Sequence, residues 1–412
     1  MRATVLVGLA AAIVLGMAGC PTGLHDDDLG DDDDSSVGDD DSAGDDDTAV
    51  GDDDDTTGFE LTIGPEETAS TVSGLSRPSL ALDSLGQPHI VADMGNPQVY
   101  ILHRLGGDWQ EELFAEWTAE VDASRVYLPH IEIDGSDRAW VSAWLGVKDG
   151  GNTPGQGVWL VTDVASQPDS TYLGVANAGS KNGNLALDPA DPGRAIVMAR
   201  TGLYELFDSG GSTGETGQFA IGDSGEKLRF LVRPREGEPG IWHAVMSGYS
   251  LEPSRYRNSG MESRVTWADY DAYDGMGEDM LHPGLGVDGE DPTVGYMAIR
   301  YHPGVVFNVW NGEGLGFDPG SLPVLDPSAG SHGNGGERFG PQFAPAPGRG
   351  AFVCWTGGDG WVRLSRLTPD GSWDEPLQVA EGSSCTITAG ADGALHMAYV
   401  HGQLRYRRIE VH

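Results

Sequence analysis

The sequence has little positive charge. Its 412 residues include 24 lysines and arginines against 64 aspartates and glutamates, and the formal net charge at pH 7 is −40. Proteins that bind nucleic acid by neutralising its phosphates need a basic footprint. This composition therefore excludes nucleic acid as a partner.

The sequence also lacks the common catalytic and nucleotide-binding motifs. It contains no Walker loop, no G-x-S-x-G elbow, no H-E-x-x-H motif and no Ser/His/Asp set. A glycosidase needs two carboxylates at a set separation, and the many acidic residues do not single out a pair. No motif indicates an enzyme class.

Residues 1–19 are typical of a secretion signal. Arg2 is followed by an apolar run from Ala3 to Met17, which is too short for a membrane span, and then by small residues. The run M-A-G-C at 17–20 resembles a bacterial lipobox. The resemblance implies that Cys20 is lipidated and anchors the protein to the bacterial envelope, at the outer membrane on its periplasmic side or at the cell surface. Cleavage by ordinary signal peptidase, with Cys20 incidental, is the alternative.

Much of the negative charge follows this signal. Residues 26–55 contain 17 aspartates and no basic residue, in blocks that each end at a glycine. A segment without apolar surface cannot offset the entropy of ordering, so we expect 20–58 to be a disordered spacer, extended by self-repulsion. A calcium-binding array is the alternative, although runs of adjacent aspartates lack the alternate ligand spacing of ordered calcium loops.

From residue 59 onward the sequence is periodic. Short β-rich segments bounded by Gly, Pro or Asp recur in units of about 51 residues. The last unit stops after its third strand, so we expect the segment 59–64 to supply the missing strand and close a ring. The first strands of the units start near residues 78, 129, 184, 228, 283, 341 and 384.

These units resemble the four-stranded antiparallel blades of a seven-bladed β-propeller. The G-x-P-H motif at 86–89 and the D-G-S-W hairpin at 370–373 are similar to motifs in propellers of the sialidase-like, neuraminidase-repeat superfamily. The resemblance covers residues 59–412 and implies the fold more than an activity, because function depends on sites. The true Asp-box of that superfamily, S-x-D-x-G-x-x-W, is absent.

The resemblance to a propeller implies that the starts of the first strands and the ends of the second strands lie on one face of the domain. Basic and aromatic residues recur there, which predicts a cationic mouth for an anionic ligand, since arginine binds carboxylate or sulfate bidentately and tryptophan stacks on sugar rings. The default interpretation is that each arginine pairs with a local carboxylate and each tryptophan fills space between blades. The candidates are Arg77, Arg125, Trp144, Lys181, Arg200, Arg229, His282, Arg300, Arg338 and Trp355.

Two cysteines remain besides Cys20. Cys354 falls on a predicted second strand and Cys385 on the first strand of the next unit. They are predicted either to form a disulfide, which an exported protein permits, or to be buried as free thiols.

Histidines and one acidic loop complete the candidate residues. His89, His243 and His396 recur at second-strand starts, which predicts packing or a turn hydrogen bond, whereas His130 is a candidate base without an identifiable partner. A solvated loop is the default interpretation of the acidic cluster, and structural calcium, the one metal suggested, is the alternative. The cluster comprises Asp269, Asp271, Asp274 and Glu278.

Together these features predict a lipid-anchored, monomeric, extracytoplasmic β-propeller that needs no cofactor. It is expected to bind a ligand or protein partner, with an anionic glycan as the favoured ligand, and to catalyse nothing. The alternative is a polysaccharide-active enzyme, either a sialidase-like hydrolase or a propeller lyase for acidic glycans.

Overall fold

The regular structure is β throughout the part of the chain that the structure describes. Among these residues no helix is long and apolar enough to cross a bilayer. The computed structural model describes residues 60–94, 98–116, 123–147, 155–164, 166, 168–176, 185–188, 191–200, 203–218, 227–235, 238–247, 250–257, 260–264, 268–269, 281–287, 295–301, 304–310, 324–326, 341–346, 348–368 and 371–412.

The described strands form antiparallel sheets, each of which we name by its first strand. They comprise β3 (Ser76–Leu82), β4 (Pro88–Asp93), β5 (Gln98–Leu105) and β6 (Asp108–Glu116); β7 (Ala123–Ile133), β8 (Ala139–Val147), β9 (Gly155–Thr162) and β10 (Asp169–Ala176); β11 (Leu185–Asp188), β12 (Asp191–Arg200), β13 (Leu203–Asp208) and β14 (Gly211–Gln218); β15 (Lys227–Arg235), β16 (Glu238–Ser247), β17 (Ser250–Arg257), β18 (Gly260–Arg264) and β19 (Ala268–Asp269); β20 (Leu281–Val287), β21 (Gly295–Tyr301), β22 (Gly304–Trp310) and β23 (Val324–Asp326); β24 (Gln342–Pro345), β25 (Ala351–Thr356), β26 (Trp361–Leu367) and β27 (Leu377–Glu381); and β28 (Ser383–Ala389), β29 (Leu395–His401) and β30 (Gln403–Val411) with β1 (Leu61–Ile63) and β2 (Glu67–Thr68).

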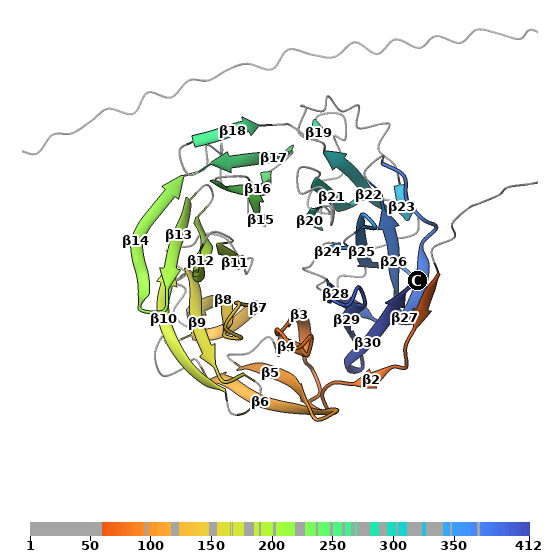
Figure 1. Cartoon of the computed structure of the whole chain (residues 1–412), viewed down its shortest axis with the longest axis horizontal. Helices are drawn as coiled ribbons and strands as arrows, with labels where there is room; N and C mark the ends of the chain where they lie inside the picture. Colours follow the sequence, from red (N-terminus) through yellow and green to blue (C-terminus); the bar gives the residue numbers. More distant parts are fainter. Residues whose placement is uncertain are drawn as a thin grey trace, which may run out of the picture. The chain divides into compact units, whose positions relative to one another are not determined.

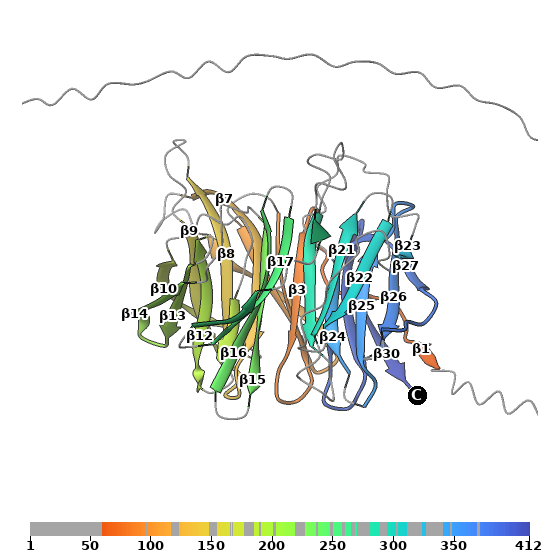
Figure 2. The ribbon, with the colours of Figure 1, turned by 90° about the horizontal axis from the view of Figure 1, so that it is seen from above.

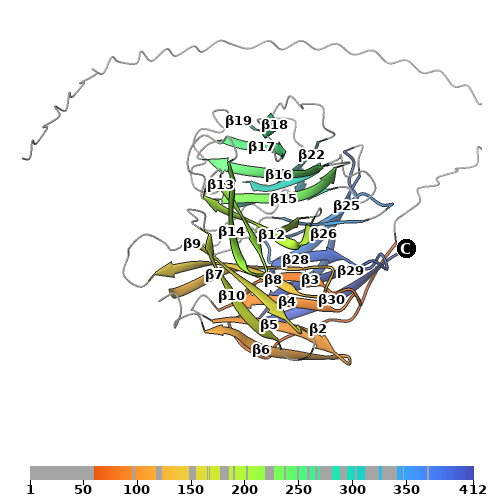
Figure 3. The same cartoon turned by 60° about the vertical axis from the view of Figure 1, so that its left-hand side comes forward.

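Within the unit Gly58–His412 the sheets follow one another around a common centre, with the first strand of each sheet innermost (Figure 1). Neighbouring first strands are in contact: β3 with β7, β7 with β11, β11 with β15, β15 with β20, β20 with β24, β24 with β28, and β28 with β3. Figure 2 shows the sheets from the side, and Figure 3 shows β28, β3 and β7 lying next to one another. This arrangement is a β-propeller-like all-β fold.

The hydrophobic core is divided into clusters that lie between consecutive sheets. Val91 and Val141 belong to one cluster between the β3 and β7 sheets, and Trp140 packs with Phe207 between the β7 and β11 sheets. Another cluster joins the last sheet to the first through Tyr406 and the residues around it. Strands with both faces buried explain why the second strands of the sequence are almost continuous apolar runs.

Aspartates at the ends of first strands form the turns that lead into the second strands. Asp83 Oδ1 accepts hydrogen bonds from the amides of Leu85 (2.9 Å) and Gln87 (2.8 Å). Asp134 does the same for Ser136 (2.8 Å) and Arg138 (3.2 Å). A side-chain oxygen that replaces a backbone acceptor is the reason aspartate is favoured at such turns.

The N-terminal strand joins the last sheet, as the sequence predicts for residues 59–64. Leu61, Thr62 and Ile63 of β1 pair with Val411, Glu410 and Ile409 of β30. The neighbouring Gly64 donates its amide to the carbonyl of Arg408 at 2.9 Å, and a Cβ at Gly64 would lie 2.5 Å from that oxygen. The close approach of the two backbones therefore requires glycine at this position.

A substitution at Gly284 tests the close approach of neighbouring first strands. A Cβ at Gly284 on β20 would lie 1.7 Å from the carbonyl oxygen of Pro341, which precedes β24. Gly284→Ala should lower the free energy of unfolding by about 1–3 kcal/mol in urea denaturation, because backbone must move to admit the methyl group. Gly135→Ala is the control, since nothing lies within 4 Å of its Cβ position. Equal losses in the two variants would contradict this account.

Candidate functional site

Arg77 is buried and paired, although the sequence places it among the ligand-binding candidates. It lies on β3 with about 9% of its surface exposed, and its guanidinium contacts the carboxylate of Asp93 at the end of β4. The other oxygen of Asp93 accepts a hydrogen bond from the amide of Leu128 on β7 at 3.1 Å. Arg77 therefore fits the interpretation in which each arginine pairs with a local carboxylate. Its partner Asp93 in turn contacts the neighbouring sheet through the amide of Leu128.

Trp355 is also buried rather than presented for stacking. Only 2% of it is exposed, and its indole nitrogen donates to Asp326 Oδ2 at 2.9 Å. The same carboxylate lies 3.4 Å from the guanidinium of Arg363. Trp144 is half-buried on β8, where it pairs with Tyr127 of β7.

The remaining candidates are placed only in part. Arg125, Arg200, Arg229, His282 and Arg300 lie in strands β7, β12, β15, β20 and β21, but their side chains fall outside the description, as does that of Asp269 in β19. Among the described residues, no group of three or more His, Cys, Asp or Glu side chains is placed to hold a metal ion. The predictions that lie outside the described residues concern Cys20, Lys181, Asp271, Asp274, Glu278 and Arg338.

The two internal cysteines are free and buried. Cys354 is 0% exposed and Cys385 is 5% exposed, and both belong to the core cluster between the β24 and β28 sheets. The structure thus has the two cysteines as buried free thiols, which is one of the two predicted states. A thiol can occupy such a core as a small hydrophobic side chain.

Two of the histidines at second-strand starts, His89 and His396, have structural partners, whereas the side chain of His243 lies outside the description. His89 Nε2 lies 3.1 Å from Asp83 Oδ2, which confirms the predicted turn hydrogen bond at that position. His396 Nδ1 lies 2.6 Å from the hydroxyl of Tyr406. Burial lowers the pKa of His89 from its ordinary value and lowers the pKa of His396 to about 4, so both rings are neutral at physiological pH.

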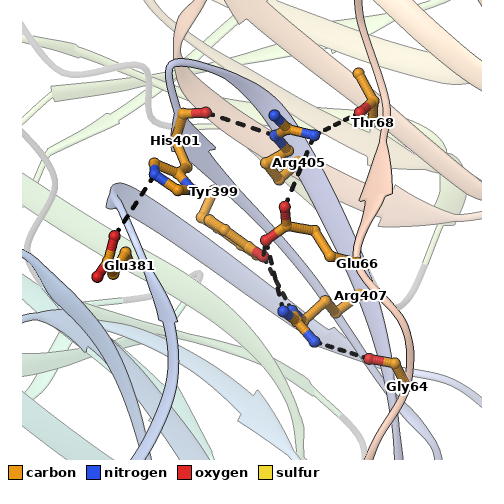
Figure 4. Close-up of polar contacts among 8 residues, drawn as sticks. All are labelled: Gly64, Glu66, Thr68, Glu381, Tyr399, His401, Arg405 and Arg407. Atoms are coloured by element: carbon orange, nitrogen blue, oxygen red, sulfur yellow. Dashed lines mark hydrogen bonds and ion pairs between the residues drawn. The ribbon is translucent and has the colours of Figure 1, made fainter.

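A polar cluster joins the N-terminal segment to the last sheet (Figure 4). Glu66, between β1 and β2, accepts a hydrogen bond of 2.5 Å from the hydroxyl of Tyr399 on β29. Arg407 on β30 donates to that hydroxyl at 3.0 Å and to the carbonyl of Gly64 at 2.9 Å. Arg405, two residues earlier on the same strand, lies 3.7 Å from the Glu66 carboxylate. We call Glu66, Tyr399, Arg405 and Arg407 the latch cluster.

The charges of the latch cluster stabilise Glu66 as a carboxylate. Burial alone would raise the pKa of the Glu66 carboxyl, but the hydrogen bond from Tyr399 and the positive charges of Arg405 and Arg407 outweigh burial and hold that pKa below its ordinary value. Burial, reinforced by the hydrogen bond to Glu66, raises the pKa of Tyr399 to about 12.

The latch cluster is therefore suited to fastening the chain and not to catalysis. A tyrosine nucleophile must reach its substrate and lose its proton, but Tyr399 is 0% exposed and its raised pKa opposes ionisation. Glu67, next to the cluster, also contacts Arg104 (3.1 Å) and Trp109 (3.0 Å) in the β3 sheet. The N-terminal segment thus ties the last sheet to the first.

A second cluster lies on two neighbouring innermost strands. The hydroxyl of Ser79 on β3 lies 3.3 Å from Nδ1 of His130 on β7. Nε2 of the same ring lies 3.0 Å from Oε1 of Glu132. His130 and Glu132 are two residues apart on one strand and so share a face. Their side chains are 25% and 39% exposed, while Ser79 is 7% exposed. We call these three residues the inner-strand set.

The inner-strand set was missed because its members belong to different repeats. The sequence contains no local Ser/His/Asp motif, so it gave no reason to expect such a set. A partner for His130 could not be identified from the residues near it in the chain. One signal was present: Ser79 and His130 are equivalent residues, each in the pattern x-P-x-Φ-x-Φ-D, where Φ is apolar, at residues 77–83 and 128–134. Equivalent positions on adjacent first strands lie side by side, which is what brings the two side chains together.

Comparison with known proteins gives no family assignment. The sequence matches no protein-family model and no curated protein. A similar solved structure is the crystal structure of AofleA from Arthrobotrys oligospora, with a TM-score of 0.47 and 10% sequence identity over 86% of this chain and 89% of that chain. A likeness at this level carries no argument about function.

The latch cluster should make stability depend on pH through Glu66. Glu66→Gln should lower the free energy of unfolding by about 1–2 kcal/mol at pH 7, because it removes a charge that Tyr399 and two arginines stabilise. Since the folded-state pKa of Glu66 lies below its ordinary value, this stabilisation is present above the unfolded pKa and is lost as pH falls through the folded pKa. Urea denaturation of the wild type and of Glu66→Gln should therefore give free energies of unfolding that differ at pH 7 and become similar under acidic conditions.

The control for this measurement is Glu381→Gln. Glu381 lies 3.8 Å from His401, and its side chain is 63% exposed, so its removal should change stability little at either pH. A Glu66→Gln difference that is the same at pH 7 and at pH 3 would contradict the role of the ionised carboxylate.

Proposed function

We propose that the chain is an exported lipoprotein whose seven sheets form a closed β-propeller that binds an extracellular or periplasmic ligand. The observation that carries this proposal is the unbroken order of contacts between first strands, from β3 through β28 and back to β3. A ring without free sheet edges is a rigid support for a binding face.

The joining of the N-terminal strand to the last sheet supports ring closure. Strand β1 pairs with β30, and the adjoining β2 pairs with the same strand, while Glu67 contacts Trp109 of the first sheet. A ring fastened in this way links its first and last units without further covalent bonds. The proposed closed propeller thus uses the same device that the sequence predicts for residues 59–64.

The N-terminal segments support an anchored location. A signal of residues 1–19, a lipobox-like M-A-G-C and an acidic spacer of residues 20–58 precede the propeller in the sequence. A lipidated Cys20 attached to such a spacer would hold the domain away from a membrane surface.

Binding is favoured over sialidase-like hydrolysis by the state of Tyr399. The Tyr–Glu–Arg arrangement of the latch cluster is buried, and burial raises the pKa of its phenol to about 12. The ligand class remains the anionic glycan that the basic residues of the sequence suggest. Because Arg77 is occupied by Asp93, the proposed contacts are Arg125, Arg200, Arg229 and Arg300.

Membrane attachment is tested by changing Cys20. Cys20→Ser should move the protein from the membrane fraction to the soluble fraction, since serine cannot carry the thioether-linked lipid, while Thr22→Ala should leave it in the membrane fraction. Mass spectrometry of the mature N-terminus should show an acylated Cys20. An unmodified N-terminus, with the protein still exported, would contradict the anchor.

Glycan binding is tested with the exported chain carrying Cys20→Ser. On an array of acidic and neutral polysaccharides it should bind the acidic ones, with affinity that falls as salt concentration rises. The double change Arg125→Gln and Arg300→Gln should reduce this binding at least tenfold. Absence of binding to every acidic glycan, or equal binding to neutral ones, would overturn this part of the proposal.

A further inference from the structure

We propose that Ser79, His130 and Glu132 form a nucleophile, base and positioning residue that hydrolyse a small carboxylic ester at the inner strands. A nucleophile activated by a base, which a third group orients in turn, is the general signature of covalent catalysis. The geometry of the inner-strand set has these parts at 3.3 Å and 3.0 Å.

For a neutral His130 ring, the hydrogen-bond partners decide which nitrogen carries the proton. The carboxylate of Glu132 can only accept, so Nε2 of His130 carries the proton that the two share. In the neutral ring Nδ1 is then an acceptor, and it faces the Ser79 hydroxyl. The Ser79 oxygen accepts from the amide of Ile131 at 3.2 Å, which leaves its single hydrogen for His130. In this tautomer the three groups are arranged for proton transfer from serine to histidine.

The reaction that follows is balanced with water as the co-reactant. Ser79 Oγ attacks the ester carbonyl carbon while its proton passes to His130 Nδ1. The carbon–oxygen bond to the leaving alcohol breaks, and that alcohol takes the proton from His130. Water then attacks the acyl-serine and gives a proton to His130, which returns it to Ser79 as the carboxylic acid leaves.

The local backbone is compatible with this arrangement. Arg77 and Leu128 have φ angles of 52° and 53°, and each stands two residues before a member of the set, at a shift in strand register. Ser384 on β28 has a φ of 54° at the equivalent place, so the bulge belongs to the repeat and sets the direction of the side chains that follow it. Among the described first strands, β3 and β7 are the neighbours that carry serine and histidine at the position two residues after the bulge.

The side chains of the set also depart from what the repeat places there. The position equivalent to Glu132 holds the buried small residues Ala81, Ala186, Gly286 and Ala344 in four other described first strands, Val232 in β15 and the partly exposed Thr388 in β28. No other described first strand has an acidic residue at this position. The pairing of Glu132 with His130 supplies a reason for both residues.

This inference goes beyond the proposed function and does not depend on it. It requires only the contact between β3 and β7, whereas glycan binding concerns arginines at the ends of the strands. A failure to bind glycans would leave the hydrolytic activity standing, and an unreactive Ser79 would leave glycan binding standing.

A fluorophosphonate probe tests the nucleophile on the folded, full mature chain. Peptide mass spectrometry should find the probe on Ser79. His130→Gln should slow labelling by roughly a hundredfold, because the base is removed while Ser79 keeps its bond to Ile131. Thr386→Ala is the matched control, since Thr386 is equivalent to Ser79 on β28 and is also 7% exposed. This control should be labelled at the wild-type rate.

Hydrolysis of p-nitrophenyl acetate separates a positioning role for Glu132 from a structural one. Glu132→Gln should lower kcat with KM and the thermal midpoint unchanged, and Ser79→Ala should abolish turnover above background. If folded wild-type protein is not labelled at Ser79, or if His130→Gln is labelled as fast as wild type, the proposal is wrong.

Discussion

The close approach of neighbouring first strands is the constraint on which the rest of the structure depends. Gly284 has no room for a methyl group beside Pro341, and Gly286 has none beside the ring of Phe343. Small residues at the inner strands let the faces of consecutive sheets meet farther out, where large side chains such as Trp140 and Phe352 are completely buried. Dense packing leaves little tolerance for added volume at the narrow end of each sheet.

Buried charged and polar contacts connect neighbouring sheets in addition to apolar packing. The Asp93 carboxylate receives Arg77 from its own sheet and an amide from the next, and Asp326 receives Trp355 and Arg363. Removing one member of a buried pair leaves an uncompensated charge, so the loss of either residue should destabilise the fold. The latch cluster applies the same principle to the two ends of the chain, where β1 must be held against β30.

The strand order and turns were predictable because they depend on local patterns. Alternation of short apolar runs with Gly, Pro and Asp predicted the strands, and the aspartates at 83 and 134 do make the turns. Local pairing of Arg77 and burial of Trp355 were among the predicted alternatives, but their partners Asp93 and Asp326 were not predictable, because these depend on which carboxylate lies opposite after folding. Likewise, nothing local distinguishes a buried free Cys354 from a disulfide-bonded one. Sequence spacing fixes neither a partner in another strand nor the direction of a side chain at a bulge.

A repeated fold makes function visible through departures from the repeat. Among equivalent strands, a residue that only one unit carries is a candidate for a role that the other units lack. His130 and Glu132 are such residues, because β7 alone among the described first strands has histidine and glutamate at these two positions. The stiffness that the inner strands need for packing also holds Ser79 and His130 in a fixed relation, which is the preorganisation that proton transfer requires. At the position equivalent to Gly284, β3 and β7 carry Ser79 and His130, and the side chains of these two residues contact each other across the neighbouring strands.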